Sequence, residues 1–111
     1  MASRPVPEGS PLSLDRIIHG PLRLGIVGAL ATTERRTFTE LRDALGATDG
    51  NLNASLQKLE QAGYVAAAKR VDGRVAVTEY QLTRAGRKAL AGYLEQLERI
   101  VSPLRDRTQG T

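Results

Sequence analysis

Cysteine is absent from this chain of 111 residues, and histidine occurs once, at position 19. Disulfides, thiolate nucleophiles, zinc fingers and iron–sulfur clusters are therefore excluded, and one histidine is too few for a histidine-built metal site. The sequence also lacks clustered carboxylates and a glycine-rich loop that could cradle a phosphate, so it contains no catalytic constellation. We expect a protein that is not an enzyme and that carries no metal or cofactor.

Aromatic residues make up only 4% of the chain, and tryptophan is missing. Proteins that bind single-stranded nucleic acid hold the bases on aromatic faces, so this class is disfavoured. Leucine is abundant instead, which predicts an aliphatic core. Arginine far outnumbers lysine, a balance that suits phosphate and groove contacts but fits a bias in genome composition equally well.

The sequence has no long hydrophobic run. Its longest apolar stretch, residues 24–31, is far shorter than the ~20 residues of a membrane-spanning helix. The first eleven residues contain three prolines and no apolar segment, unlike a signal peptide. We predict a cytoplasmic protein without a membrane segment, in which residues 1–12 form a disordered leader, residues 13–104 one folded domain and residues 105–111 a polar tail.

The charge is basic and unevenly distributed. The net charge is +4 and the pI about 10.0. Residues 46–92 carry seven Lys or Arg against four Asp or Glu, a net charge of +3, whereas residues 1–45 carry +1 and residues 93–111 are neutral. An anionic partner is indicated, with nucleic acid as the first candidate.

The first half of the chain contains signals for three helices. Ser13 is expected to cap a short helix over residues 14–19, and a second helix begins at Pro21, since proline suits the first helical position. After a short extended link, Thr39 is expected to cap a helix over residues 40–45.

The next helix is predicted over residues 49–62, with Thr48 or Asp49 as its cap and Gly63 as its stop. Leu52, Leu56 and Leu59 share one face of it, which should be buried. Only three residues separate this helix from the preceding one, which is about the spacing of a helix-turn-helix.

A hairpin and a long helix complete the chain. Strands are predicted over residues 64–70 and 75–82, with the turn at Asp72-Gly73. Thr83 is expected to cap the last helix, which Pro103 should end or kink near Ser102. The spacing of its apolar residues is typical of a coiled-coil seam. The seam consists of Leu90, Leu94, Leu97, Val101 and Leu104.

A hairpin directly after a helix-turn-helix predicts an α+β, mainly α fold: a winged helix-turn-helix with a two-stranded wing and extra N- and C-terminal dimerisation helices. Five short motifs in order also resemble one family. They are His-Gly-Pro-Leu-Arg-Leu from residue 19, Phe-Thr-Glu-Leu from 38, Thr-Asp-Gly-Asn-Leu from 48, Leu-Glu-Gln-Ala-Gly-Tyr-Val from 59 and Thr-Glu-Tyr-Gln-Leu-Thr-Arg-Ala-Gly from 78.

Over about residues 14–101 the chain resembles the small winged-helix transcriptional regulators related to the MarR and ArsR groups. The resemblance implies a homodimer, held by its first and last helices, that places two recognition helices in successive major grooves of double-stranded DNA. Metal regulation of the ArsR type is not carried over, because the cysteine ligands are missing. The residues expected at the dimer interface are Leu14, Ile17, Ile18 and the seam residues Leu90, Leu94, Leu97, Val101 and Leu104.

In a winged helix, the helix over residues 49–62 enters the major groove, and the side opposite its leucines faces the bases. Asn53 and Gln57 are the best candidates for reading base edges, because amide side chains pair with adenine. Lys58 suits phosphate or guanine. The full set expected on DNA from this helix is Gly50, Asn51, Asn53, Ala54, Gln57 and Lys58. The alternative is that they are ordinary solvated polar residues.

The wing, about residues 69–76, carries Lys69, Arg70 and Arg74, and an arginine at its tip could enter a narrow minor groove. A merely solvated hairpin tip is the competing interpretation. Thr39, Arg42 and Arg23 are expected to add contacts to the DNA backbone.

Two functions remain open: a dimeric regulator, by default a repressor that occludes a promoter, or a winged helix used for protein interaction or as a non-specific architectural DNA-binding module. His19 is more simply a structural or interface residue than a ligand. The operator, the target genes, the choice between activation and repression, and the existence of a small-molecule effector leave no motif in the sequence.

Overall fold

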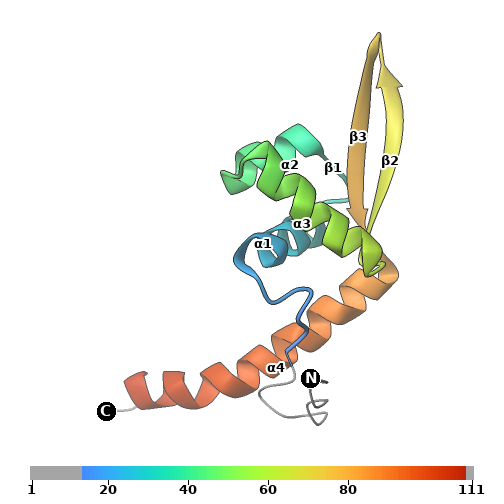
Figure 1. The fold of residues 1–111 in the computed structure, drawn as a ribbon. Coiled ribbons are helices and arrows are strands. Elements are labelled where there is room, and N and C mark those ends of the chain that lie inside the picture. The colour runs from blue at the N-terminus through green and yellow to red at the C-terminus, as the bar shows by residue number, and fades with distance from the viewer. Residues whose placement is uncertain (1–13, 110–111) are drawn as a thin grey trace, which may run out of the picture.

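The computed structural model describes residues 14–109 of the chain. The elements are α1 (Pro21–Ala31), β1 (Arg36–Thr37), α2 (Phe38–Leu45), α3 (Asp49–Gln61), β2 (Val65–Asp72), β3 (Val75–Leu82) and α4 (Arg84–Gln109). The strands form one antiparallel sheet in the order β1-β3-β2, and Figure 1 shows the hairpin and α4 projecting from the helical body. The predicted α+β winged helix is confirmed. The predicted leader, residues 1–12, lies outside the described residues.

The core is aliphatic apart from two tyrosines, as the composition predicted. α1 packs against α2, α3, β3 and α4, so it lies at the centre of the domain. Burial of each large side chain stabilises the fold by about 1.5–3 kcal/mol. The buried residues are Ile18, Ile26, Val27, Leu30, Leu41, Leu52, Leu56, Leu59, Val65, Tyr80, Leu82 and Tyr93.

The predicted cap of α2 is wrong by two residues. Thr37, not Thr39, is the N-cap: its hydroxyl accepts a hydrogen bond from the Glu40 N–H at 3.1 Å, and the Glu40 carboxylate accepts one from the Thr37 N–H at 2.9 Å. This capping box satisfies two N–H groups at once, which a cap at Thr39 would not. The hydrogen bonds from Thr37 also lower the pKa of Glu40.

The caps of α3 and α4 agree with the sequence analysis. Thr48 caps α3 by accepting a hydrogen bond from the Asn51 N–H at 3.2 Å. The Thr83 hydroxyl accepts one from the Gly86 N–H at 3.0 Å and donates to the Gly63 carbonyl at 2.6 Å. Thr83 therefore ties the start of α4 to the end of α3.

The short helix predicted over residues 14–19 is only a turn. The Asp15 carboxylate accepts hydrogen bonds from the N–H groups of Ile17 and Ile18, at 2.8 and 3.2 Å, and so closes the turn. Such a local bond competes with helix formation, and Gly20 is extended because Pro21 disfavours helix before it. The predicted cap, Ser13, lies outside the described residues.

His19 joins this turn to α4. Its Nδ1 lies 2.9 Å from the Tyr93 hydroxyl, in hydrogen-bonding contact. The Tyr64 hydroxyl likewise donates to the Asp15 carboxylate at 2.5 Å. The segment before α1 is thus held to α4 and to Tyr64, which lies between α3 and β2.

The hairpin turn lies one residue later than predicted. Asp72 pairs with Val75, so the two turn residues are Gly73 and Arg74 rather than Asp72 and Gly73. Gly73 has φ 66°, the conformation that a tight turn with glycine in its first central position requires. Arg74 consequently occupies the tip of the wing.

Pro103 was predicted to end or kink the helix near Ser102. α4 continues through it to Gln109, so the first of these two outcomes, a helix end, is wrong. Proline removes one intrahelical hydrogen bond, to the carbonyl of Arg99. Arg99 lies on the exposed side of α4, where an unpaired carbonyl costs less than in the core. An ion pair between Glu98 and Arg105 also links the turns on either side of Pro103.

Within residues 14–109, none of the helices combines the length and the apolar character needed to cross a membrane.

Candidate nucleic-acid interface

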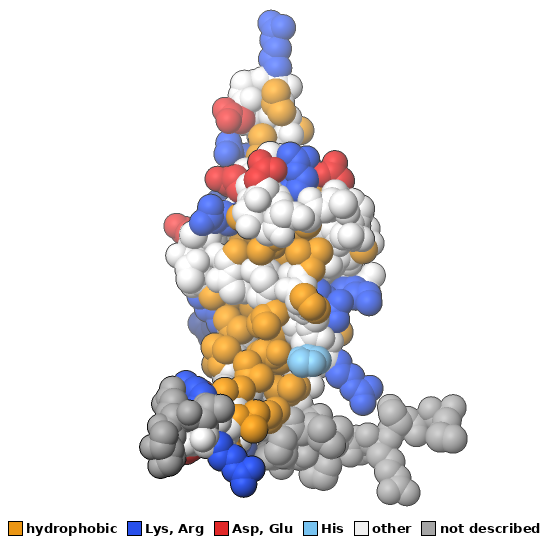
Figure 2. Space-filling model, turned by 90° about the vertical axis from the view of Figure 1, so that its left-hand side faces the viewer, with side chains coloured by type: hydrophobic (Ala, Val, Ile, Leu, Met, Phe, Trp, Pro, Cys, Tyr) orange, Lys and Arg blue, Asp and Glu red, His pale blue; other side chains and the backbone are white. Residues whose placement is uncertain are grey.

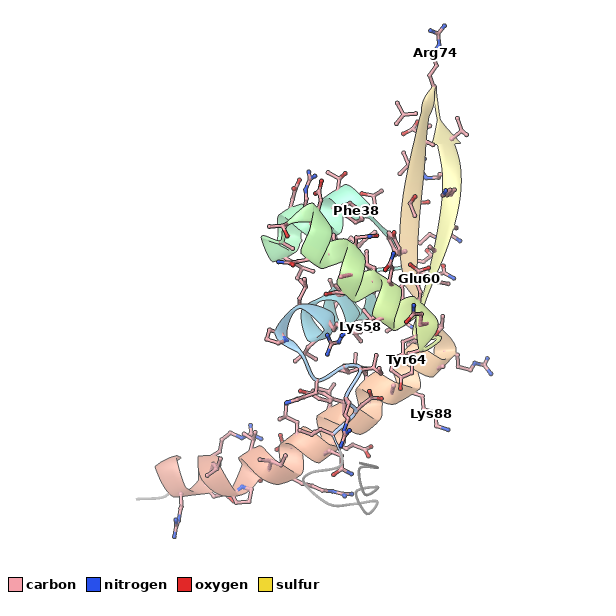
Figure 3. The ribbon with its side chains drawn as sticks, in the orientation of Figure 1. Phe38, Lys58, Glu60, Tyr64, Arg74 and Lys88 are labelled. Atoms are coloured by element: carbon pink, nitrogen blue, oxygen red, sulfur yellow. The ribbon has the colours of Figure 1, made fainter. Side chains whose placement is uncertain are left out.

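α3 presents a continuous polar face to solvent. Leu52, Leu56 and Leu59 have no exposed surface, so they fix the rotation of the helix against the core. Every α3 residue predicted to contact DNA is exposed on the remaining surface. Asn53 and Gln57 lie on the same side of the helix as Glu60, which Figure 3 shows at the base of the wing. The exposed set is Gly50, Asn51, Asn53, Ala54, Gln57 and Lys58.

The wing extends far beyond the body of the domain. β1 pairs with β3 only at Glu79 and Tyr80, so the outer part of the hairpin has no third strand. Figure 3 shows Arg74 at the extreme tip. Two valines are exposed near the tip, Val71 by 72% and Val75 by 63%, and the Asp72 carboxylate is exposed beside them.

The wing cations differ in their partners. Arg70 donates from Nε to the Glu79 carboxylate at 2.8 Å and has Nη1 3.8 Å from the Asp72 carboxylate. Lys69 and Arg74 form no ion pair with any described residue. The charge of Arg70 is therefore partly neutralised within the wing, and Lys69 and Arg74 are the stronger candidates for DNA contact.

Arg42, expected to contact the DNA backbone, is also engaged within the protein. Its side chain pairs with Asp49 at 3.0 Å and with Asp43 at 3.2 Å, and hydrogen bonds to these two carboxylates raise its pKa. Asp49 lies in the first turn of α3, so this pair holds α2 against the start of α3.

A groove of about 430 Å³ lies between the wing and the start of α2. Thr39 lines it together with Phe38, and Arg70 and Val75 line its wing side. Thr39 is exposed in the first turn of α2. The structure thus brings Thr39 near the wing, a proximity that the sequence did not indicate.

The residues predicted at a dimer interface fall into three groups. Leu94 and Leu104 are 51% and 59% exposed on α4. Leu14, Ile17, Leu90, Leu97 and Val101 are half-buried, all but Val101 against the core. Ile18 has no exposed surface, so we reassign it to the core. Figure 2 shows hydrophobic side chains gathered on the lower part of one face.

The sequence analysis missed one concavity. About 400 Å³ in volume, it lies between the segment before α1 and the second half of α3, and Arg16, Arg23 and Lys58 all line it. Lys58 and Arg23 were expected on DNA, but Arg16 was not considered. No local motif could have shown the site, because its residues come from distant parts of the chain.

Comparison with known proteins gives a consistent result. The model of a family described as winged helix DNA-binding domain matches residues 22–101. An uncharacterized protein of Methanocaldococcus jannaschii is 36% identical over 83 residues, which cover 74% of this chain and 89% of that protein.

Solved structures with the same fold include several transcriptional regulators. A transcriptional regulator homologue from Pyrococcus horikoshii OT3 superposes with a TM-score of 0.76 and 28% identity, covering 81% of this chain and 89% of that one. A protein assigned to the MarR family of regulators, from Enterococcus faecalis V583, superposes with a TM-score of 0.72 and 23% identity, covering 86% of this chain and 84% of that one. Bacillus subtilis PadR, in complex with operator DNA, superposes with a TM-score of 0.57 and 19% identity, covering 63% of this chain and 44% of that one.

Proposed function

Because the chain belongs to the winged helix DNA-binding domain family, we propose that it is a homodimeric, sequence-specific regulator of transcription that represses by occupying its operator. The family and fold are those of DNA-binding transcriptional regulators rather than of enzymes. The resemblance to MarR-related regulators is supported by structural neighbours that include one assigned to that family.

The observation that carries the proposal is the exposed face of α3. A helix with side chains, about 10–12 Å across, fits a major groove about 12 Å wide. Asn53 and Gln57 lie exposed on this face, and their amides can pair with adenine edges. The leucines of the opposite face are fully buried, so α3 meets DNA with this side.

The wing supplies contacts of a different kind. Arg74 at the tip and Lys69, which forms no ion pair within residues 14–109, place positive charge on the hairpin beside α3. Contacts from such cations to phosphates or to a narrow minor groove position a protein on DNA and carry little sequence information. We assign base reading to α3 and sequence-independent affinity to the wing.

We assign dimerisation to α4 and the segment before α1. α4 has 26 residues, a length of about 39 Å, and its second half extends away from the helical body (Figure 1). Leu94 in the first half of α4 and Leu104 in its second half are exposed at coiled-coil spacing, with Val101 between them. Leu14, Ile17, Leu90 and Leu97 continue the apolar surface towards the core.

Selection of duplex DNA from a random pool by the full chain tests the proposal. We expect the selected sequences to converge on an inverted repeat whose half-sites are about 10 base pairs apart, because a two-fold dimer binds two half-sites about one helical turn apart. At physiological salt the protein should bind a selected duplex about 10³-fold more tightly than a shuffled one.

The alternative, a winged helix used for protein interaction or for non-specific architectural DNA binding, predicts a different outcome. No sequence should then be enriched, and selected and shuffled duplexes should bind equally at every salt concentration. Convergence on a single half-site would retain specific binding but contradict the dimer.

A further inference from the structure

Three cations converge on a cleft beside α3. Arg16 comes from the segment before α1, Arg23 from α1 and Lys58 from α3. The other lining residues are Ile17, Gln61 and Ala62, so the cleft contains no carboxylate. We refer to it as the basic cleft.

The positive charge of the basic cleft is not neutralised within the described part of the chain. Arg16, Arg23 and Lys58 form no ion pair with any residue of 14–109, in contrast to Arg42 and Arg70. Like charges that share a concavity repel one another, and an anion bound between them removes this cost.

Arg23 is held in place before any ligand binds. Its Nε donates to the Ile17 carbonyl at 2.5 Å, and its Nη2 lies 3.3 Å from the Arg16 carbonyl. The guanidinium also lies directly against Gly20, where a Cβ would come within 2.8 Å of Nη2. A guanidinium fixed in this way loses little side-chain entropy when it binds an anion.

The basic cleft lies on the opposite flank of α3 from the wing. Glu60 is directed to the base of the wing and Lys58 to the segment before α1 (Figure 3). A helix that occupies the major groove has a phosphodiester strand along each side. With the wing serving one side, the basic cleft is placed to meet the strand on the other.

We propose that Arg16, Arg23 and Lys58 form a phosphate-binding site that takes a backbone phosphate of bound DNA, on the side of α3 away from the wing. The inference rests on the proposed function, because it places α3 in the major groove. It adds the segment before α1 to the DNA-binding surface.

The salt dependence of DNA binding tests the site. The probe is a fluorescein-labelled duplex of about 30 base pairs with random sequence, and binding is measured by fluorescence anisotropy between about 50 and 300 mM KCl. The double variant Arg16→Gln/Lys58→Gln leaves Arg23 and the turn that it supports intact. We expect the slope of log K against log [KCl] to become shallower by about 2, since each phosphate contact contributes about 0.9.

Arg87→Gln/Lys88→Gln is the matched control, because it removes the same two charges from exposed positions on α4. Its slope should equal that of the parent, and melting followed by circular dichroism should show that both variants fold. If the parent binds DNA and the two double variants have equal slopes, the basic cleft does not bind backbone phosphate.

A second arm distinguishes free phosphate from DNA. Thermal melting is compared in sodium phosphate and in sodium chloride of equal ionic strength. If phosphate stabilises the parent but not the cleft variant, while the DNA slopes of the cleft and control variants agree, the cleft holds free phosphate and the assignment to DNA is wrong. If the parent does not bind the duplex at all, the proposed function itself fails.

Discussion

At the scale of single residues, Tyr64 ties the connection between α3 and β2 to the segment before α1. It immediately precedes β2, and its hydroxyl donates to the Asp15 carboxylate at 2.5 Å. This hydrogen bond, with a smaller effect of burial, raises the pKa of Tyr64 to about 12. Because the phenol titrates at about 10 in an unfolded chain, its contribution to stability is complete below pH 10 and is lost as the pH rises through 12.

Tyr64→Phe should therefore lower the free energy of unfolding at pH 7 by about 1 kcal/mol, the usual contribution of one partly exposed hydrogen bond. The difference between parent and variant should shrink between pH 10 and 12, because the ionised phenolate no longer donates to Asp15. Urea unfolding of both proteins at pH 7, 10 and 12 measures it. Equal stability at pH 7 would show that the hydrogen bond contributes nothing.

The parts of the site that the sequence could not predict are those where residues far apart in the chain come together. The spacing of the α3 leucines in the sequence predicted which face of the helix is buried. The exposed positions of Asn53 and Gln57 on α3 could therefore be predicted as well. The basic cleft could not, since Arg16 and Lys58 meet only through the fold. The ion pair between Arg70 and Glu79 also depends on the hairpin register.

At the scale of elements, the packing of α4 on the start of β2 depends on Gly86. A Cβ at this position would lie 2.2 Å from the Tyr64 carbonyl oxygen and 2.6 Å from Leu82. Gly92, also in α4, has open space around it. The two glycines therefore occupy one helix in opposite environments.

Gly86→Ala should destabilise the protein by about 1–3 kcal/mol, because the added methyl group displaces backbone and core side chains. Gly92→Ala should stabilise it by about 0.5–1 kcal/mol, since alanine favours the helix. Urea unfolding of both variants checks the pair. If both substitutions stabilise the protein, α4 does not pack closely against the Tyr64 carbonyl at Gly86.

The elements themselves were largely predictable, and the errors have local causes. Helix and strand periods placed α1, α3 and the hairpin correctly. α2 is capped by Thr37 and not by Thr39, because the capping box at Thr37 satisfies two backbone N–H groups. The hairpin turn is formed by Gly73 and Arg74 instead of Asp72 and Gly73, because the glycine occupies the first central position of the turn. α4 passed through Pro103, where one lost hydrogen bond did not end an exposed helix.

At the scale of the whole molecule, charge and apolar surface are separated. Cations lie on both flanks of α3, with Arg74 at the wing tip and the basic cleft on the other side. The exposed leucines Leu94 and Leu104 lie on α4. The proposed dimer would join two copies through α4 and leave both α3 helices facing DNA, so that one domain would serve both recognition and assembly.

The central claim is that α3 reads bases while the wing adds affinity without specificity. The most direct test measures the binding of Gln57→Ala and Arg74→Ala to one selected duplex and to its shuffled version by fluorescence anisotropy at fixed salt. Gln81→Ala serves as the control, since it removes the same amide from an exposed position on β3.

Gln57→Ala should reduce the preference for the selected duplex by about 5- to 150-fold, which corresponds to about 1–3 kcal/mol for one base contact. Arg74→Ala should weaken binding to both duplexes by the same factor and leave the preference unchanged. If Gln57→Ala retains the full preference of the parent and of Gln81→Ala, α3 does not read the bases through Gln57 and the central claim is contradicted.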